Sequence, residues 1–450
     1  MAKTKFLSPF ASLQLPQDDI EKIELLTDMF VCKNTLQYEE FVYQQQQAID
    51  ENAWKLVKQR ENVLVYSERS KSSTQRPKSA SLGGEAPRGA DDNDTQKQQT
   101  LSELPVMLVV GSVVGTLEDM MYGVVNHTLQ AMRVKTSYVG DNVSDAAVLA
   151  TLVTPTLENP FQSLTIKWME NEQALVYRPL VRNRDFVYME TTGITQTSRG
   201  ERIGFHLLHS VHFPQTHELE GRVRGNMSVC GIYRQKPDNP NEVDVYVKGI
   251  LNPGGNIMRA IVVSASADAL VSAWRNVECG HMKKLAWMLR TMRRSFSTAS
   301  SSTASDDDDS RLQQSRKSSD VGCCVTCSKA PSSLSRSMLG DVRKRKCNLC
   351  WKYICSSCKV KKTLSHLSSA TGKLRQKEFV FCANCIREAV TASAFSIAQR
   401  EFATIDPFGM GSELFSTNHP ERILDMAAAS GGVAAQRGSS NLLVESLIST

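Results

Sequence analysis

The hydrophobic pattern of this chain is dominated by a series of runs in which apolar and polar residues alternate. Val243-Asp-Val-Tyr-Val247 is an example, and turns containing Gly, Asn or Pro separate the runs. Alternation with a period of two is typical of strands that bury one face of an antiparallel sheet. The pattern predicts strands at 63–66, 106–114, 163–169, 184–192, 202–211, 222–233 and 242–251.

Helical spacing occurs before, within and after these strands. Residues 17–48 place apolar side chains such as Ile20 and Ile23 on one face. Thr116-Leu-Glu-Asp119 is similar to a capping box and predicts a helix that continues through Leu129. A long helix is predicted at 266–292, with one bulky stripe that lies across the sheet. The stripe contains Leu270, Trp274, Val277, His281, Leu285 and Met288.

This order of elements predicts an α+β fold and resembles the START-like helix-grip domain. The local sequences that carry the resemblance are Trp54-Lys-Leu-Val-Lys58 before Val63-Leu-Val-Tyr66, Arg184-Asp-Phe-Val-Tyr188, and Asp244-Val-Tyr-Val-Lys248 before Asn252-Pro-Gly-Gly-Asn-Ile257. The resemblance covers residues 15–293, with 70–102 as a disordered insertion. It implies an antiparallel sheet around a long C-terminal helix, and a pocket for one lipid such as a sterol or phospholipid.

No catalytic constellation is visible in this region, so we expect no enzyme activity. The histidines His206, His209, His212 and His217 follow one strand and its loop. His206 and His209 should point to opposite faces of the sheet, which argues against a zinc site; half-exposed strand histidines are expected instead. Arg178, Arg182 and Arg184 are alternatives for a charge that lines the pocket.

Composition adds boundaries to this picture. Residues 70–102, 294–320 and 406–450 are rich in small and polar residues, and the second of these segments contains Asp306-Asp-Asp-Asp309. Such segments bury too little surface to offset chain entropy, so we expect disordered linkers and a tail of low order. The net charge of +6 is mild and does not argue for a nucleic-acid partner.

The amino terminus shows no signal peptide and no run of apolar residues is long enough for a membrane span, so a cytoplasmic location is expected. Cytosolic thiols are kept reduced, which favours zinc over disulfides for paired cysteines. Cys32, Cys230, Cys279 and Cys323 are scattered and are expected to be buried apolar residues or bystanders.

The other eight cysteines form four Cys-x2-Cys pairs: Cys324 with Cys327, Cys347 with Cys350, Cys355 with Cys358, and Cys382 with Cys385. Two thiolates separated by two residues can bind one zinc ion from a single tight turn, and two such pairs complete a four-sulfur shell. The sequence therefore predicts two zinc ions. Because few apolar residues are available for a core there, the metal should supply much of the folding free energy.

The spacing of the pairs, with gaps of 19, 4 and 23 residues, and the aromatic segment Trp351-Lys-Tyr-Ile354 resemble a FYVE-type zinc finger at 321–392. The resemblance implies a cross-brace in which alternate pairs share a metal. One zinc ion would be held by Cys324, Cys327, Cys355 and Cys358, and the other by Cys347, Cys350, Cys382 and Cys385.

FYVE fingers recognise phosphatidylinositol 3-phosphate on endosomal membranes, so the resemblance implies a peripheral membrane location. The lipid headgroup would contact the basic strand Arg343, Lys344, Arg345 and Lys346, and Met338 and Leu339 would insert into the membrane. Three elements depart from the family. The paired histidines are replaced by Arg345 and Lys346, the Trp-x-x-Asp element is missing, and Val380 stands where an Arg is expected.

These observations favour a zinc-binding lipid and membrane adaptor with two partners, a phosphoinositide-containing membrane and a single lipid. Two alternatives stay open. A RING-like ubiquitin ligase shares the cross-brace, but most RING fingers have His where this chain has Cys350, and they do not need a basic run. A protein-interaction zinc module that has lost lipid binding would explain the three departures.

Overall fold

The computed structural model describes residues 6–69, 104–171, 182–255, 257–297, 322–330, 345–367 and 373–405. The insertion 70–102 and the tail 406–450, both predicted to lack order, lie outside the described residues. Of the predicted linker 294–320, residues 294–297 belong to a helix and the rest lies outside.

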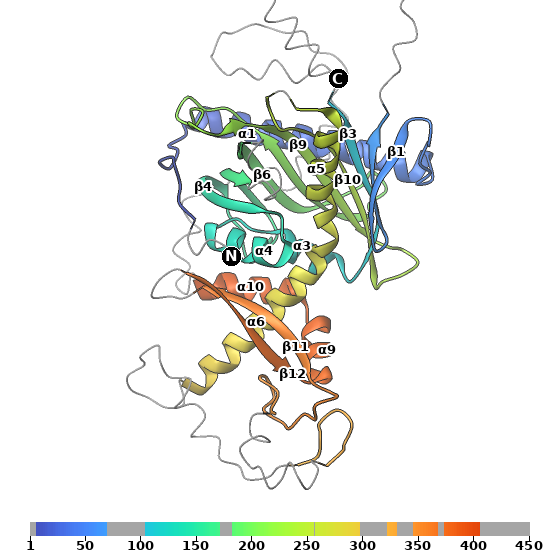
Figure 1. The fold of residues 1–450 in the computed structure, drawn as a ribbon, viewed down its shortest axis with the longest axis vertical. Coiled ribbons are helices and arrows are strands. Elements are labelled where there is room, and N and C mark those ends of the chain that lie inside the picture. Colours follow the sequence, from blue (N-terminus) through green and yellow to red (C-terminus); the bar gives the residue numbers. More distant parts are fainter. Residues whose placement is uncertain are drawn as a thin grey trace, which may run out of the picture.

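A large antiparallel sheet forms the main domain (Figure 1). Its strands hydrogen-bond in the order β1-β2-β3-β10-β9-β7-β6-β5-β4, and the short β8 pairs with β6 in parallel. The strands are β1 (Trp54–Arg60), β2 (Val63–Glu68), β3 (Val106–Val114), β4 (Val143–Val153), β5 (Ser163–Asn171), β6 (Arg184–Gln196), β7 (Arg202–Ser210), β8 (Val223–Arg224), β9 (Asn226–Gln235) and β10 (Glu242–Asn252). The pairing of β3 with β10 joins the early and late strands of the domain.

Every strand run predicted from the sequence is present, with one correction. The run 222–233 is divided at Gly225 into β8 and β9. A Cβ at Gly225 would lie 2.4 Å from the Phe186 ring, so the chain passes too close to β6 for any larger residue. Strands β1 and β4 were not predicted. The alternation on which the prediction depends is weak in β4, because this strand is nearly continuous in apolar residues and its pairing with β5 contains register shifts.

Helix α1 (Gln17–Glu39) covers one face of the sheet and begins at the predicted residue. Ile23, Val31 and Tyr38 are buried there in one cluster with Ile166 and Trp168 of β5. The helix ends in a π-helical turn at Glu40–Gln44. Phe10 and Leu13, which precede the predicted domain start at residue 15, are buried in the same cluster.

The opposite face is covered by α3 (Leu117–Val124) and α5 (Arg259–Val271), which pack on different strands. The predicted capping box is confirmed, since Thr116 Oγ1 accepts a hydrogen bond from Asp119 N at 3.1 Å. The predicted continuous helix through Leu129 is wrong. The chain leaves α3 at Val125 and starts α4 (Leu129–Val139) with Thr128 as a new N-cap.

The predicted single helix at 266–292 is also divided. It consists of α5, a 3₁₀ turn at Ser272–Arg275 and α6 (Asn276–Ser297). Arg275 in the turn donates to the carbonyl oxygen of Val139 at 3.1 Å. A periodic apolar stripe cannot reveal this break, because the contact that accompanies it comes from α4.

Helix α6 crosses α3 at unusually short range and then leaves the sheet domain (Figure 1). A Cβ on Gly123 would lie 1.8 Å from the Asn276 carbonyl oxygen, and one on Gly280 would lie 2.2 Å from that of Asp119. Only glycine at both positions permits this crossing. The second half of α6 then packs against the cysteine-rich module.

That module contains the hairpin β11 (Val360–Leu367) and β12 (Leu374–Phe381), followed by α9 (Ala383–Thr391) and α10 (Ala394–Ile405). None of these four elements was predicted from the sequence. Met282, Leu285 and Leu289 of α6 are buried in one cluster with Phe379 and Phe381 of β12. The module therefore shares its apolar core with a helix of the main domain.

A buried lysine ties the module to the main domain at a second point. Lys284 of α6 is fully buried and forms an ion pair with Asp119 of α3 at 2.6 Å. The same ammonium group donates to the carbonyl oxygens of Val390 and Ala392 at 2.6 and 2.9 Å. These carbonyls mark the end of α9, so one charge joins three helices.

Candidate metal centres and a buried polar cluster

The first and second cysteine pairs lie on turns of the same form. In the first, Ser328 follows Cys327 and has φ of +57°; in the second, Trp351 follows Cys350 and has φ of +61°. The backbone N–H of each of these residues donates to the carbonyl of the first cysteine of its pair, at 2.8 and 3.0 Å. Both turns therefore present two thiols on one side.

The fourth pair is placed by a helix instead. Cys382 is the N-cap of α9, and its Sγ accepts from the backbone N–H of Cys385 at 3.4 Å. Further backbone N–H groups point at sulfur, from Cys355 to Cys324 Sγ and from Cys382 to Cys347 Sγ, both at 3.4 Å. Hydrogen bonds to sulfur favour the thiolate form that binds metal.

The structure brings the eight cysteines together as two tetrads, in the grouping that the cross-brace implies. Cys324, Cys327, Cys355 and Cys358 form one, and Cys347, Cys350, Cys382 and Cys385 the other. Within each tetrad, the sulfur atoms lie within 4.8 Å of one another. Cys32, Cys230, Cys279 and Cys323 belong to neither tetrad.

The sulfur separations fit a tetrahedral metal site. Cys327 Sγ lies 3.8 Å from Cys355 Sγ, and Cys350 Sγ lies 3.8 Å from Cys382 Sγ. Four sulfurs at about 2.3 Å from a central zinc ion would be about 3.8 Å apart in a regular tetrahedron. A disulfide would need about 2.05 Å. Each tetrad can therefore hold one metal ion.

The two tetrads differ in their surroundings. Three of the four cysteines in the second tetrad are buried, and they share the apolar cluster that includes Leu285 and Leu289 of α6. In the first tetrad only Cys324 is buried. Cys324 of the first tetrad belongs to the same cluster, so both metal positions adjoin the apolar core that the module shares with α6, and the second position is the more deeply buried.

Half of the predicted headgroup strand is described. Arg345 and Lys346 are half-buried directly before Cys347, and Lys346 forms an isolated antiparallel bridge with Tyr353. Arg343, Lys344, Met338 and Leu339 lie outside the described residues. Val380 stands at the position of an expected Arg, and its backbone forms two hydrogen bonds with Asn348. Val380 N donates to Asn348 Oδ1 at 2.8 Å, and Val380 O accepts from Asn348 N at 2.8 Å.

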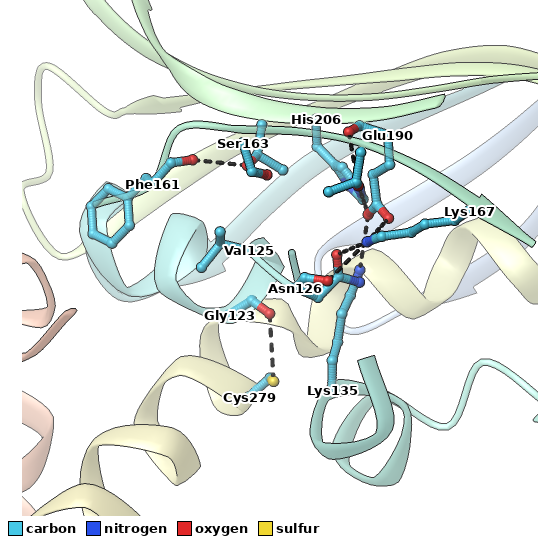
Figure 2. Close-up of polar contacts among 12 residues, drawn as sticks. Gly123, Val125, Asn126, Lys135, Phe161, Ser163, Lys167, Glu190, His206 and Cys279 are labelled. Carbon is cyan, nitrogen blue, oxygen red and sulfur yellow. Dashed lines mark hydrogen bonds and ion pairs between the residues drawn. The ribbon is translucent and has the colours of Figure 1, made fainter. Parts of the chain in front are cut away.

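A polar cluster lies inside the main domain, on the sheet face toward α3 (Figure 2). Lys167 of β5 is fully buried and contacts Glu190 of β6 at 2.5 Å. Its ammonium group also donates to the carbonyl and side-chain oxygens of Asn126, at 2.8 and 2.7 Å. His206 of β7 lies 2.6 Å from Glu190 Oε1, and Lys135 of α4 lies 4.0 Å from the same oxygen.

The charges in this cluster can be assigned from their surroundings. Burial alone would raise the pKa of Glu190, but Lys167, His206 and Lys135 outweigh it and hold that pKa well below its usual range. Burial lowers the pKa of His206, and Lys135 adds to the effect. Burial also lowers the pKa of Lys167, and the ion pair with Glu190 opposes this effect.

The histidine prediction is correct in one respect and wrong in another. His206 and His209 do point to opposite faces, since His206 contacts Glu190 and His209 packs on Phe30 of α1. Neither is half-exposed; both are buried. Periodicity placed them on a strand but could not show that helices cover both of its faces.

Of the predicted pocket arginines, Arg184 is buried and donates to the carbonyl oxygen of Pro253 at 3.3 Å. Arg182 is exposed, and Arg178 lies outside the described residues. The polar cluster uses neither of the described arginines. Lys167 and Glu190 were missed, because in sequence each is one polar residue in an alternating strand.

Two pockets of the described residues lie away from this cluster. One, of about 350 Å³, is lined by Ser12–Leu15, Ile20 and residues 148–152 of β4. The other, of about 220 Å³, lies between α4, α6 and the β11–β12 hairpin. Neither is the predicted pocket between the sheet and α5. Among the described helices, none is long and apolar enough to cross a membrane.

No protein-family model matches this chain, and no curated protein matches it. Solved structures similar to it are lipid-transfer domains related to StAR. Human STARD10 has a TM-score of 0.33 and 13% identity, covering 59% of this chain and 81% of that one. Human StAR-related lipid transfer protein 5 has a TM-score of 0.34 and 17% identity, and the match covers 55% of this chain and 99% of that one. A fragment of a StAR-related lipid transfer protein from Xanthomonas axonopodis has a TM-score of 0.31 and 16% identity, and the match covers 50% of this chain and 99% of that one. At these scores the similarity assigns no ligand to this chain.

Proposed function

We propose that this protein is a zinc-binding, non-enzymatic lipid and membrane adaptor. Its cysteine-rich module acts as a FYVE-like finger on membranes that contain phosphatidylinositol 3-phosphate, and its sheet domain binds one lipid. The arrangement of the eight cysteines as two interleaved sulfur tetrads carries the proposal. We further propose that both metals are zinc and that the protein works on the cytoplasmic side of endosomal membranes.

The charge of the described part of the module supports membrane contact. Arg345 and Lys346 adjoin the second metal position, and Lys352, Lys359 and Lys361 are exposed. Each Lys or Arg close to an anionic leaflet contributes about 1 kcal/mol to binding. The departures at Val380 and at the missing histidines affect the specific recognition of one headgroup more than this general attraction.

Flotation with liposomes tests the finger. We expect full-length, metal-loaded protein to float with vesicles containing phosphatidylinositol 3-phosphate, and to float several-fold less when Arg343 through Lys346 are all changed to Ala. Control vesicles have the same negative charge, supplied by phosphatidylserine in place of the phosphoinositide. They separate recognition of the headgroup from attraction to charge alone. Changing Lys22 and Lys55, which lie in the main domain, to Ala is the control. Equal flotation with and without the phosphoinositide, unchanged by the Ala variant, excludes this role.

The buried polar cluster supports lipid binding by the sheet domain. The sheet face covered by α3 and α5 is apolar along β3, β9 and β10, where Val109, Val229 and Val247 are buried. The cluster around Lys167 and Glu190 gives the β5–β6 side of the same face hydrogen-bonding groups. An amphiphile with an apolar body and a polar end matches this division.

Mass spectrometry of lipid extracted from the purified protein tests this domain. We expect about one equivalent of a single lipid class, and less of it in Val109→Trp, which fills the apolar face. Val114→Trp is the control, because Val114 lies on the same strand but is exposed. Circular dichroism must show that both variants fold. Absence of lipid after expression in several hosts, or equal loading of both variants, contradicts the proposal.

A protein-interaction module is the second candidate, and one observation favours it. The module already engages a protein surface, since the cluster around its second tetrad includes α6 of the main domain. In this reading the sulfur tetrads serve to hold the β11–β12 hairpin and α9 in place. Failure of flotation together with intact metal binding would select this candidate.

A further inference from the structure

Helix α1 carries apolar side chains on two opposite sides. One side faces the sheet and buries Ile23, Val31 and Tyr38. The other side holds Leu25, Met29 and Leu36, whose side chains are 51%, 52% and 59% exposed, together with the exposed Cys32. At 3.6 residues per turn these four fall within an arc of about 60°, opposite the buried row.

This outer row differs from ordinary surface apolar residues. A helix that covers a sheet normally has a polar outer side, and isolated exposed apolar residues need no explanation. Here the four residues follow one another at intervals of four, three and four. That is the a/d repeat of a two-stranded coiled coil, with Leu25 and Cys32 at d and Met29 and Leu36 at a.

The charges beside the row distinguish two ways of pairing. Glu21, Asp28 and Glu39 lie on one flank of the row. Lys22 and Lys33 lie on the other flank, and Glu40 follows them on that flank at the carboxyl-terminal end. In a parallel pair related by a two-fold axis along the helices, the acidic flank of one helix faces the basic flank of the other. In an antiparallel pair, like flanks face each other and repel.

We propose that α1 is a dimerisation surface whose partner is a second copy of this chain, packed in parallel. Asp28 then faces Lys33 of the partner subunit, and the symmetry repeats this contact. Cys32 lies beside Cys32 of the partner subunit. Because α1 covers the sheet with its other side, the two main domains stand on opposite sides of the helix pair. This proposal does not depend on lipid or membrane binding.

The length of the row sets the strength of the dimer. It spans three helical turns, whereas stable protein interfaces bury about 1,200–2,000 Å². The dimer is therefore weak in dilute solution and requires capture or a high local concentration. Proteins held on one membrane reach such concentrations.

Disulfide capture provides the first test. Full-length, metal-loaded protein with Cys323→Ser, which removes another exposed thiol, is oxidised briefly with diamide. We expect a dimer linked through Cys32, identified by peptide mass spectrometry and absent in Cys32→Ser. Leu36→Glu should lower its yield more than about tenfold, since it places a carboxylate in the seam. Met258→Glu is the control, because Met258 is 71% exposed but lies outside α1.

Charge exchange tests the orientation and the identity of the partner. Asp28→Lys alone and Lys33→Asp alone should each lower the dimer yield by about fivefold, because each makes both symmetric contacts repulsive. Mixing the two variants should restore the yield, since every contact is again between opposite charges. Circular dichroism verifies that each variant folds. If mixing restores nothing, or Cys32 forms no dimer at high protein concentration, the outer side of α1 has another occupant and the proposal is wrong.

Discussion

Removal of metal is expected to unfold the cysteine-rich module and also to destabilise the main domain. The module has its apolar core in common with α6, where Leu285 and Leu289 pack beside Cys347, Cys382 and Cys385. Structural zinc contributes about 10–16 kcal/mol of apparent folding free energy in small zinc-binding peptides. Without it the module cannot hold its hairpin, and α6 loses the partner of its second half.

Hydrogen–deuterium exchange with and without a chelator measures both effects. We expect protection to disappear throughout β11, β12 and α9, and to decrease in α6 and α3. Cys347→Ser should reproduce this change, whereas Cys32→Ser, outside both tetrads, should leave it unaltered. Metal analysis of untreated protein should give about two equivalents. A module that keeps its protection in the chelator, or exchange confined to the module, would disprove the coupling.

Replacing Lys284 by Met is expected to lower the free energy of unfolding by about 3–5 kcal/mol. The substitution preserves volume but removes a fully buried charge. Asp119 loses its ion pair at 2.6 Å, and the carbonyl oxygens of Val390 and Ala392 lose their donor. His281, 3.3 Å from Asp119, replaces the lost charge only when protonated. An unpaired buried carboxylate is far more costly than a lost surface contact.

Chemical denaturation measures this change, and limited proteolysis locates it. Cleavage should appear between α9 and α10, near Ala392, where the lysine fastens the chain. Lys22→Met is the matched control, because Lys22 is a largely exposed helical lysine that forms a local ion pair with Asp19. A loss below about 1 kcal/mol would show that the buried lysine is not what fastens the module.

The cysteine grouping shows how far local sequence can reach. A Cys-x2-Cys pair can bind metal from one tight turn, so the spacing alone indicates where sulfur atoms converge. The family resemblance supplied the interleaving, and the tetrads have that order. The hairpin that separates the third and fourth pairs was not foreseen, since Val360–Leu367 and Leu374–Phe381 carry little alternation and many lysines.

The sequence by itself determined most strands of the main sheet, although not β1 and β4, together with the start of α1, the capping box at Thr116 and the positions of the paired cysteines. Each depends on neighbours within a few residues, where periodicity and turn chemistry act. Only the tertiary structure decided that α6 serves two domains and that Lys167, Glu190 and His206 meet across three strands. An apolar stripe, or a single polar residue in an alternating strand, indicates only that a side chain is buried. What it is buried against depends on segments far away in the chain.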